Sequence, residues 1–127
     1  MHLRTLLVAG LFASIHIASA RGDDWGAWRG PERTGISKEQ GLAKSWPEDG
    51  PKLLWKTEDV GEGFSTPSVA GGVLYVMGNK DREEFVFAVD VKAEGKLLWK
   101  TSLGAVRHQG AGYPGPRSTP TVDGPRL

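Results

Sequence analysis

The residues best suited to chemistry lie in a stretch rich in glycine and proline, RHQGAGYPGPR, at positions 107–117. There His108 could serve as a general base, and Tyr113 and Arg117 could line a ligand site with it where loops between strands converge. No nucleophile or carboxylate lies close to His108 in the sequence. We favour the other interpretation, a solvated loop shaped by glycine and proline, so these three residues remain loop candidates only.

The acidic residues and the glycine-rich segment GEGF (61–64) do not form a recognisable site. Asp90 follows an apolar run and is expected to accept backbone hydrogen bonds in a turn rather than to bind a metal. Asp23–Asp24 and Glu83–Glu84 are isolated pairs, whereas a hard cation needs about six converging oxygens. GEGF is too short for a phosphate-binding loop. We therefore expect no catalytic residue and no metal site, and the sequence identifies no cofactor-binding residue.

The overall composition excludes several classes of function. Lys and Arg number 16 against 15 Asp and Glu, with both signs interspersed, so the chain has no basic surface for nucleic acid. Cysteine is absent, which excludes disulfides, cysteine-ligated zinc, iron–sulfur clusters and a thiol nucleophile. It also excludes a lipoprotein anchor, which needs a cysteine directly after the cleavage site.

The first twenty residues have the features of a secretory signal peptide. Arg4 supplies the positive charge, residues 5–17 are apolar, and Ala18-Ser19-Ala20 fits the small-residue cleavage pattern. The apolar run is too short for a membrane span, which needs about 20 residues. We expect cleavage after Ala20 and a secreted or periplasmic protein with no remaining membrane span. An N-terminal core helix is the alternative.

The remainder is typical of an all-β protein with an extended arm before it. Residues 21–51 lack helical periodicity but hold Trp25, Trp28 and Trp46, which we expect to pack into a larger body. Residues 65–79 form two β-rich runs around Gly71-Gly72, a hairpin signal. Residues 84–91 are almost continuously apolar and predict a strand buried on both faces.

Two motifs occur twice in the same order. KLLWKT stands at 52–57 and 96–101, and STPSVAGGVL at 65–74 returns as STPTVDGPRL at 118–127. Self-similarity over 40 to 50 residues with about four strands per unit indicates a β-propeller blade. We expect a ring-closing strand at 52–57, a complete blade at 64–101, a connection at 102–117 and the start of a second blade at 118–127.

A further motif joins the end of one strand to the next. Ala88, Asp90, Gly95, Lys96 and Trp99 follow the order Ala-x-Asp-x-x-x-Gly-Lys-x-x-Trp. With WRGPERTGIS (28–37) and GYPGPRSTPTVDG (112–124), the chain resembles the pyrroloquinoline quinone (PQQ)-like β-propeller repeat family, in particular its secreted bacterial members. Between Asp90 and Gly95 this chain has four residues, VKAE (91–94), where the family motif has three. We therefore expect a bulge in that turn.

The resemblance implies four-stranded antiparallel blades, of which about one and a half are present. A single blade cannot bury its core, and about three repeats are needed. We therefore expect a fragment whose partners are the missing blades, with a protein ligand as a further possibility. The resemblance implies either a binding or scaffold module, in the manner of BamB-like assembly factors, or part of a PQQ-dependent alcohol dehydrogenase-like oxidoreductase. In the second case PQQ and calcium would bind only the full-length protein, and the catalytic residues would lie in downstream blades.

Overall fold

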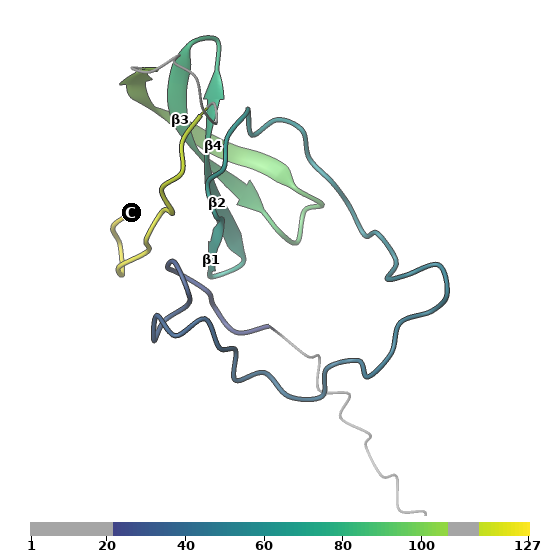
Figure 1. Cartoon of the computed structure of the whole chain (residues 1–127). Helices are drawn as coiled ribbons and strands as arrows, with labels where there is room; N and C mark the ends of the chain where they lie inside the picture. The colour runs from purple at the N-terminus through teal and green to yellow at the C-terminus, as the bar shows by residue number, and fades with distance from the viewer. Residues whose placement is uncertain (1–21, 107–114) are drawn as a thin grey trace, which may run out of the picture.

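The computed structural model describes residues 22–106 and 115–127. It contains one antiparallel sheet in the order β1-β2-β3-β4 and, within these ranges, no helix (Figure 1). The strands are β1 (Ser68–Ala70), β2 (Val73–Lys80), β3 (Glu83–Asp90) and β4 (Lys96–Ala105). The predicted all-β class is confirmed. The signal peptide predicted at residues 1–20 lies outside the described residues.

Two-residue turns join the first three strands. Gly71 and Gly72 have φ values of 60° and 82°, so the predicted hairpin is present with both turn residues in the left-handed region. Asp81 and Arg82 form the next turn with φ values of 53° and 67°, although neither is glycine. The positive φ values match the twist of a tight hairpin, which explains why these turns need them.

The core of the sheet is the centre of β3. Phe87, Ala88 and Val89 are 0%, 0% and 1% exposed, so consecutive residues are buried on both faces, as predicted for this run. Ala88 lies between Tyr75 of β2 and Trp99 of β4 in the ladder, and these two rings pack with centroids 6.0 Å apart. The small alanine therefore leaves room for two large rings on one face.

Strand β4 differs from the prediction in its length and its bulges. The blade boundary expected at residue 101 falls inside β4, which continues to Ala105 because Glu83 and Glu84 of β3 still pair with it. The register skips Leu98 and again Leu103, so each is an extra residue on β4. The turn 91–95, where a bulge was expected, closes with a wide bond from the Gly95 N–H to the Asp90 carbonyl (3.0 Å), and Glu94 and Gly95 both have positive φ values (53° and 82°). The two bulges within β4 are separate from this turn.

The chain before β1 continues alongside β2. Glu62 and Asn79 exchange both backbone hydrogen bonds (3.0 and 2.7 Å). Between this pair and β1, the Ser65 hydroxyl oxygen accepts the Met77 N–H (3.1 Å) where Pro67 breaks the ladder. A Cβ on Gly78 would collide with the Val60 carbonyl oxygen, so glycine permits this close approach.

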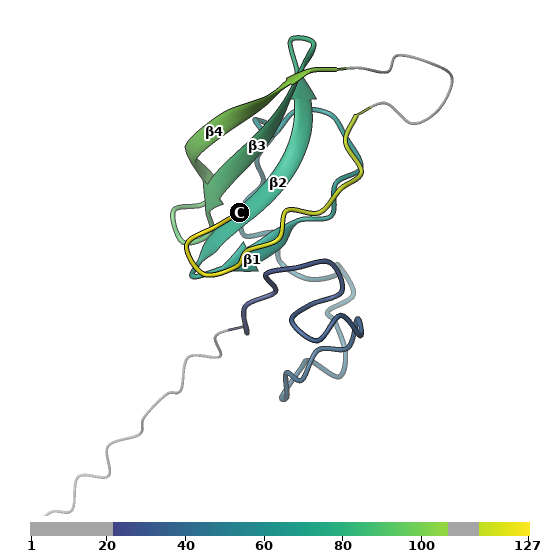
Figure 2. The same ribbon diagram turned by 90° about the vertical axis from the view of Figure 1, so that its left-hand side faces the viewer.

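The arm and the C-terminal segment lie on the β1 side of the sheet, away from β4 (Figure 2). Residues 52–57 form no strand with the described chain, and residues 118–127 form only a tight turn closed by Asp123 and Arg126. Of the three arm tryptophans, Trp25 is half-buried, whereas Trp28 and Trp46 are 55% and 66% exposed. Within the described chain only Trp25 is covered, and the packing of Trp28 and Trp46 into a larger body stays a prediction. No helix within the described ranges is long and apolar enough to cross a bilayer.

Candidate functional site

The first copy of KLLWKT packs against the turn that precedes the second copy. Trp55 is half-buried, and a Cβ built on Gly95 would lie 2.7 and 2.8 Å from two ring carbons of Trp55. Gly95 is buried and has a φ of 82°. The indole ring therefore lies on the bare backbone of this glycine, and any side chain there would displace it. A shallow hollow of about 630 Å³ lies beside the contact, between residues 56–59 and 93–96.

Three other residues of the Ala-x-Asp…Gly-Lys-x-x-Trp motif lie in or just after the same turn as Gly95: Asp90, Lys96 and Trp99. Asp90 Oδ1 accepts the N–H groups of Lys92 and Ala93 (2.8 and 3.0 Å), as expected for a turn aspartate. Lys96 opens β4, and its N–H donates to the Ala93 carbonyl (3.0 Å). Trp99 is 42% exposed. The motif thus shapes the turn between β3 and β4 and presents one partly exposed indole on the last strand.

A second junction lies where the arm meets β1 and the C-terminal segment. Trp25 and Val69 exchange two backbone hydrogen bonds (2.7 and 3.0 Å), and the Gly26 carbonyl accepts the Val122 N–H (2.7 Å). Asp24 Oδ1 accepts the N–H of Gly71 in the β1–β2 turn (3.0 Å). Three segments that are far apart in the sequence therefore meet at residues 24–26.

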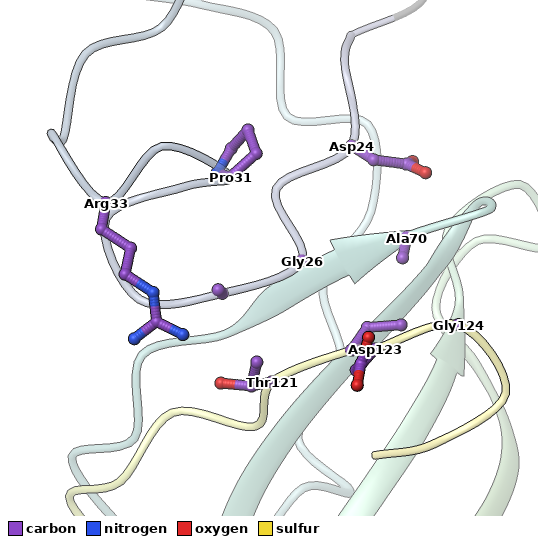
Figure 3. A pocket seen from close by; sticks show the side chains of 10 residues that line it. Asp24, Gly26, Pro31, Arg33, Ala70, Thr121, Asp123 and Gly124 are labelled. Atoms are coloured by element: carbon purple, nitrogen blue, oxygen red, sulfur yellow. The ribbon is translucent and has the colours of Figure 1, made fainter.

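An open cavity of about 680 Å³ lies at this second junction (Figure 3). Its polar side chains come from the arm and the C-terminal segment, and β1 contributes Ala70. In Figure 3 the guanidinium of Arg33 extends toward Thr121, whereas Asp24 is directed toward the β1–β2 turn. The lining residues are Asp24, Gly26, Ala27, Pro31, Arg33, Ala70, Thr121, Val122, Asp123 and Gly124. The volume lies within the range of small-molecule sites, and this lining offers one cation, two carboxylates and a hydroxyl for polar binding.

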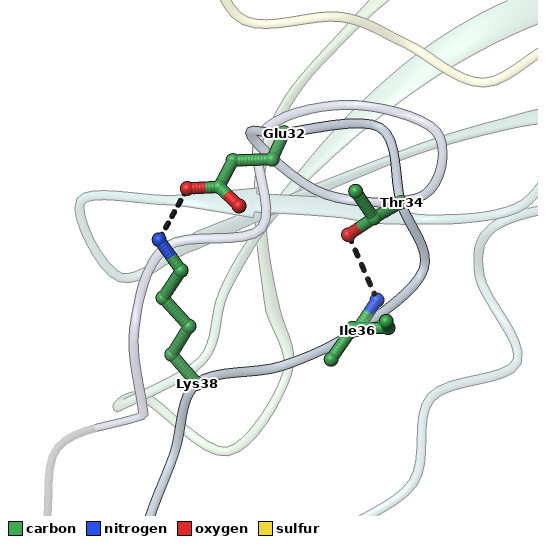
Figure 4. A network of polar contacts seen from close by, with 4 residues as sticks. All are labelled: Glu32, Thr34, Ile36 and Lys38. Atoms are coloured by element: carbon green, nitrogen blue, oxygen red, sulfur yellow. Dashed lines mark hydrogen bonds and ion pairs between the residues drawn. The ribbon is translucent and has the colours of Figure 1, made fainter.

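The wall of this cavity formed by the arm is a loop held mainly by its own contacts. Lys38 pairs with Glu32, and the Thr34 hydroxyl oxygen accepts the Ile36 N–H (3.3 Å) (Figure 4). The N–H of Asp23 donates to Glu39 Oε1 (2.9 Å) and returns the loop to its start. Because both partners of the ion pair are mostly exposed, it contributes little to stability and chiefly keeps the loop closed.

Of the three loop candidates predicted from the sequence, only Arg117 lies among the described residues. His108 and Tyr113 lie outside the described residues, so the structure does not bring them to a site. Arg117 is exposed and follows Pro116, whose carbonyl accepts the Phe64 N–H (2.8 Å). Among the described residues, no three His, Asp or Glu side chains converge as metal ligands.

Sequence reasoning missed the second junction altogether. Asp24 belongs to an isolated acidic pair that gives no signal of this contact, and Gly26 belongs to no motif. The one available signal is that Val122 belongs to the repeated STP segment. Comparison with protein-family models, curated protein sequences and solved structures found no match.

Proposed function

We propose that this chain supplies one blade, and the beginning of a second, of a secreted or periplasmic PQQ-like β-propeller that works as a binding or scaffold module. The observation that carries the proposal is the packing of Trp55 on Gly95. Here a tryptophan from one copy of the repeat rests on the turn of the next copy. Contacts of this kind between successive units are what hold repeat proteins together.

On this proposal, an equivalent contact between β4 and the following blade covers the exposed surface of β4. Trp99 occupies in the second KLLWKT the position that Trp55 has in the first. On this proposal it docks on the corresponding glycine of the following blade, and the ring-closing role of residues 52–57 follows from the same reasoning. Leu98 and Leu103, the two bulged residues, are 47% and 52% exposed and add to the apolar surface. Several exposed large apolar side chains on one strand favour an interface at this strand.

The chemistry of the cavity beside the arm supports a binding role. Its lining combines Asp24, Asp123, Arg33 and Thr121 with apolar and glycine residues. Such a set suits the recognition of a polar ligand. The alternative, a PQQ-dependent oxidoreductase, would need calcium ligands and a catalytic base from outside the described residues.

The oligomeric state and the exposed apolar surface of a protein that begins at residue 21 test the blade proposal. We expect self-association in size-exclusion chromatography and enhanced fluorescence of the dye ANS, because β4 presents apolar side chains to solvent. Leu103→Lys should reduce both signals. Leu42→Lys, at an exposed arm position away from the sheet, is the matched control and should change neither. A monomer with a sharp thermal transition and no ANS binding would contradict the proposal.

A quinone titration of the full-length protein separates the two functional candidates, because PQQ and calcium are expected to bind only that form. For a binding module, PQQ in the presence of calcium should cause no saturable quenching of tryptophan fluorescence. Saturable, calcium-dependent quenching would support the oxidoreductase instead.

A further inference from the structure

The arm binds the two copies of the STP repeat at equivalent positions. Val69 is the fifth residue of STPSV (65–69), and Val122 is the fifth residue of STPTV (118–122). Two adjacent arm residues contact them: Trp25 pairs with Val69, and Gly26 bonds to Val122. Two neighbouring arm residues therefore bond to the same position in the two copies of the repeat.

The geometry of an extended chain explains how one short segment can do this. In an extended strand, the backbone N–H and C=O of successive residues point to opposite sides. Trp25 uses both of its groups on the β1 side (2.7 and 3.0 Å), and Gly26 presents its carbonyl to the other side, where it accepts the Val122 N–H (2.7 Å). The segment thus runs between β1 and the C-terminal segment and bonds to both.

Side chains fix the position of this strand. Asp24 Oδ1 accepts the Gly71 N–H (3.0 Å), which anchors the arm at the end of β1. The Trp25 ring lies against Gly30, where a Cβ would come within 2.7 Å of the ring, so the next loop of the arm covers it. Gly26 faces Val122 at a Cβ distance of 3.5 Å. An acidic residue, an aromatic residue and a glycine in sequence therefore match the site.

We propose that the edge of β1 at Val69 and the backbone of the C-terminal segment at Val122 form one strand-accepting site, that the segment Asp24–Gly26 is its occupant, and that the arm thereby couples the two repeats. Strand addition to an open sheet edge is an established mode of peptide recognition. Here the occupant comes from the same chain, and it also covers the edge of β1 that would otherwise pair with other chains. Release of the arm from one repeat should release it from the other. This inference goes beyond the blade proposal and does not depend on Trp55 or Trp99.

A reversible cross-link tests the coupling in the whole chain. The protein has no cysteine, and the Cβ distance of 3.5 Å between positions 26 and 122 suits a disulfide, so Gly26→Cys/Val122→Cys should oxidise without denaturant. Hydrogen exchange of the Val69 amide, which donates to Trp25 and lies outside the cross-link, should slow about tenfold or more on oxidation. The Asn79 amide, bonded to Glu62, should not change.

Controls come from the same protein. Its reduced form is the matched reference for exchange. Gly41→Cys/Val122→Cys places one thiol at an arm position with no atom within 4 Å and should form no intramolecular disulfide. Failure of the first pair to oxidise, or an unchanged Val69 amide after oxidation, would overturn the inference.

A second variant tests the coupling by breaking the contact at Val69 and following the amide of Val122. Trp25→Pro removes the N–H that donates to Val69 and leaves the Gly26 carbonyl in the chain. We expect the Val122 amide to lose its protection together with that of Val69, and a synthetic peptide of residues 22–30 to restore both. Independent behaviour of the two amides would show that the arm makes two separate contacts. The blade proposal would stand in that case, because the experiment does not probe the Trp55–Gly95 contact.

Discussion

Replacement of Gly95 by alanine should be unusually costly, because two separate penalties fall on one methyl group. The residue has a φ of 82°, and its Cβ would lie 2.7 Å from Cε3 of Trp55. A non-glycine residue in the left-handed region costs about 1–2 kcal/mol. Displacement of a packed ring costs about 1–3 kcal/mol more. We expect Gly95→Ala to lower the free energy of unfolding by about 2–5 kcal/mol.

Two reference substitutions separate these penalties. Gly71 also has a positive φ (60°), but a Cβ there would meet no atom within 4 Å, so Gly71→Ala should cost only the conformational part, about 1–2 kcal/mol. Trp55→Ala removes the ring with which the new methyl group would collide. In that background Gly95→Ala should also fall to about 1–2 kcal/mol.

Urea unfolding followed by far-UV circular dichroism measures all four members of this double-mutant cycle. The coupling between positions 55 and 95 should be about 1–3 kcal/mol. If Gly95→Ala costs the same with and without the Trp55 ring, the two residues do not pack together, and the main support for the blade proposal is lost.

Substitutions at three further positions test the sheet. Gly78→Ala should destabilise by about 3 kcal/mol and abolish amide protection at Asn79, because the new methyl group would meet the Val60 carbonyl oxygen. Arg82→Gly should raise the thermal midpoint by stabilising the protein by about 1 kcal/mol, since it removes a left-handed arginine from a two-residue turn; an unchanged midpoint would refute this account. Asp90→Ala should cost about 1–2 kcal/mol in urea unfolding by removing the acceptor of two turn N–H groups, and Asp90→Asn, which keeps a side-chain oxygen, should cost less.

Local sequence signals predicted the strands well. The Gly71-Gly72 pair and the apolar run at 84–91 correspond to the hairpin and to the buried strand β3. The turn at Asp81-Arg82 was not expected, because arginine gives no signal for a positive φ. The extension of β4 to Ala105 was missed because the chain after Thr101 lacks apolar alternation, and the strand there depends on pairing with β3.

Contacts between residues far apart in the sequence were harder to predict. The repeat predicted a ring-closing strand at residues 52–57, and the structure identifies Gly95 as the surface that Trp55 of this segment meets. Nothing in the sequence indicated that residues 24–26 join two repeats. The loop candidates around His108 remain predictions, since that segment lies outside the described residues.

The sequence by itself therefore determined the class of the fold, the order of its strands and the repeat, because side-chain periodicity and turn residues act over a few positions. Only the tertiary structure decided where the arm lies. Its bonds to Val69 and Val122 are made by backbone N–H and C=O groups. Nearly every residue carries these groups, so pairing of this kind leaves almost no trace in the sequence and depends on which edges the folded sheet leaves open.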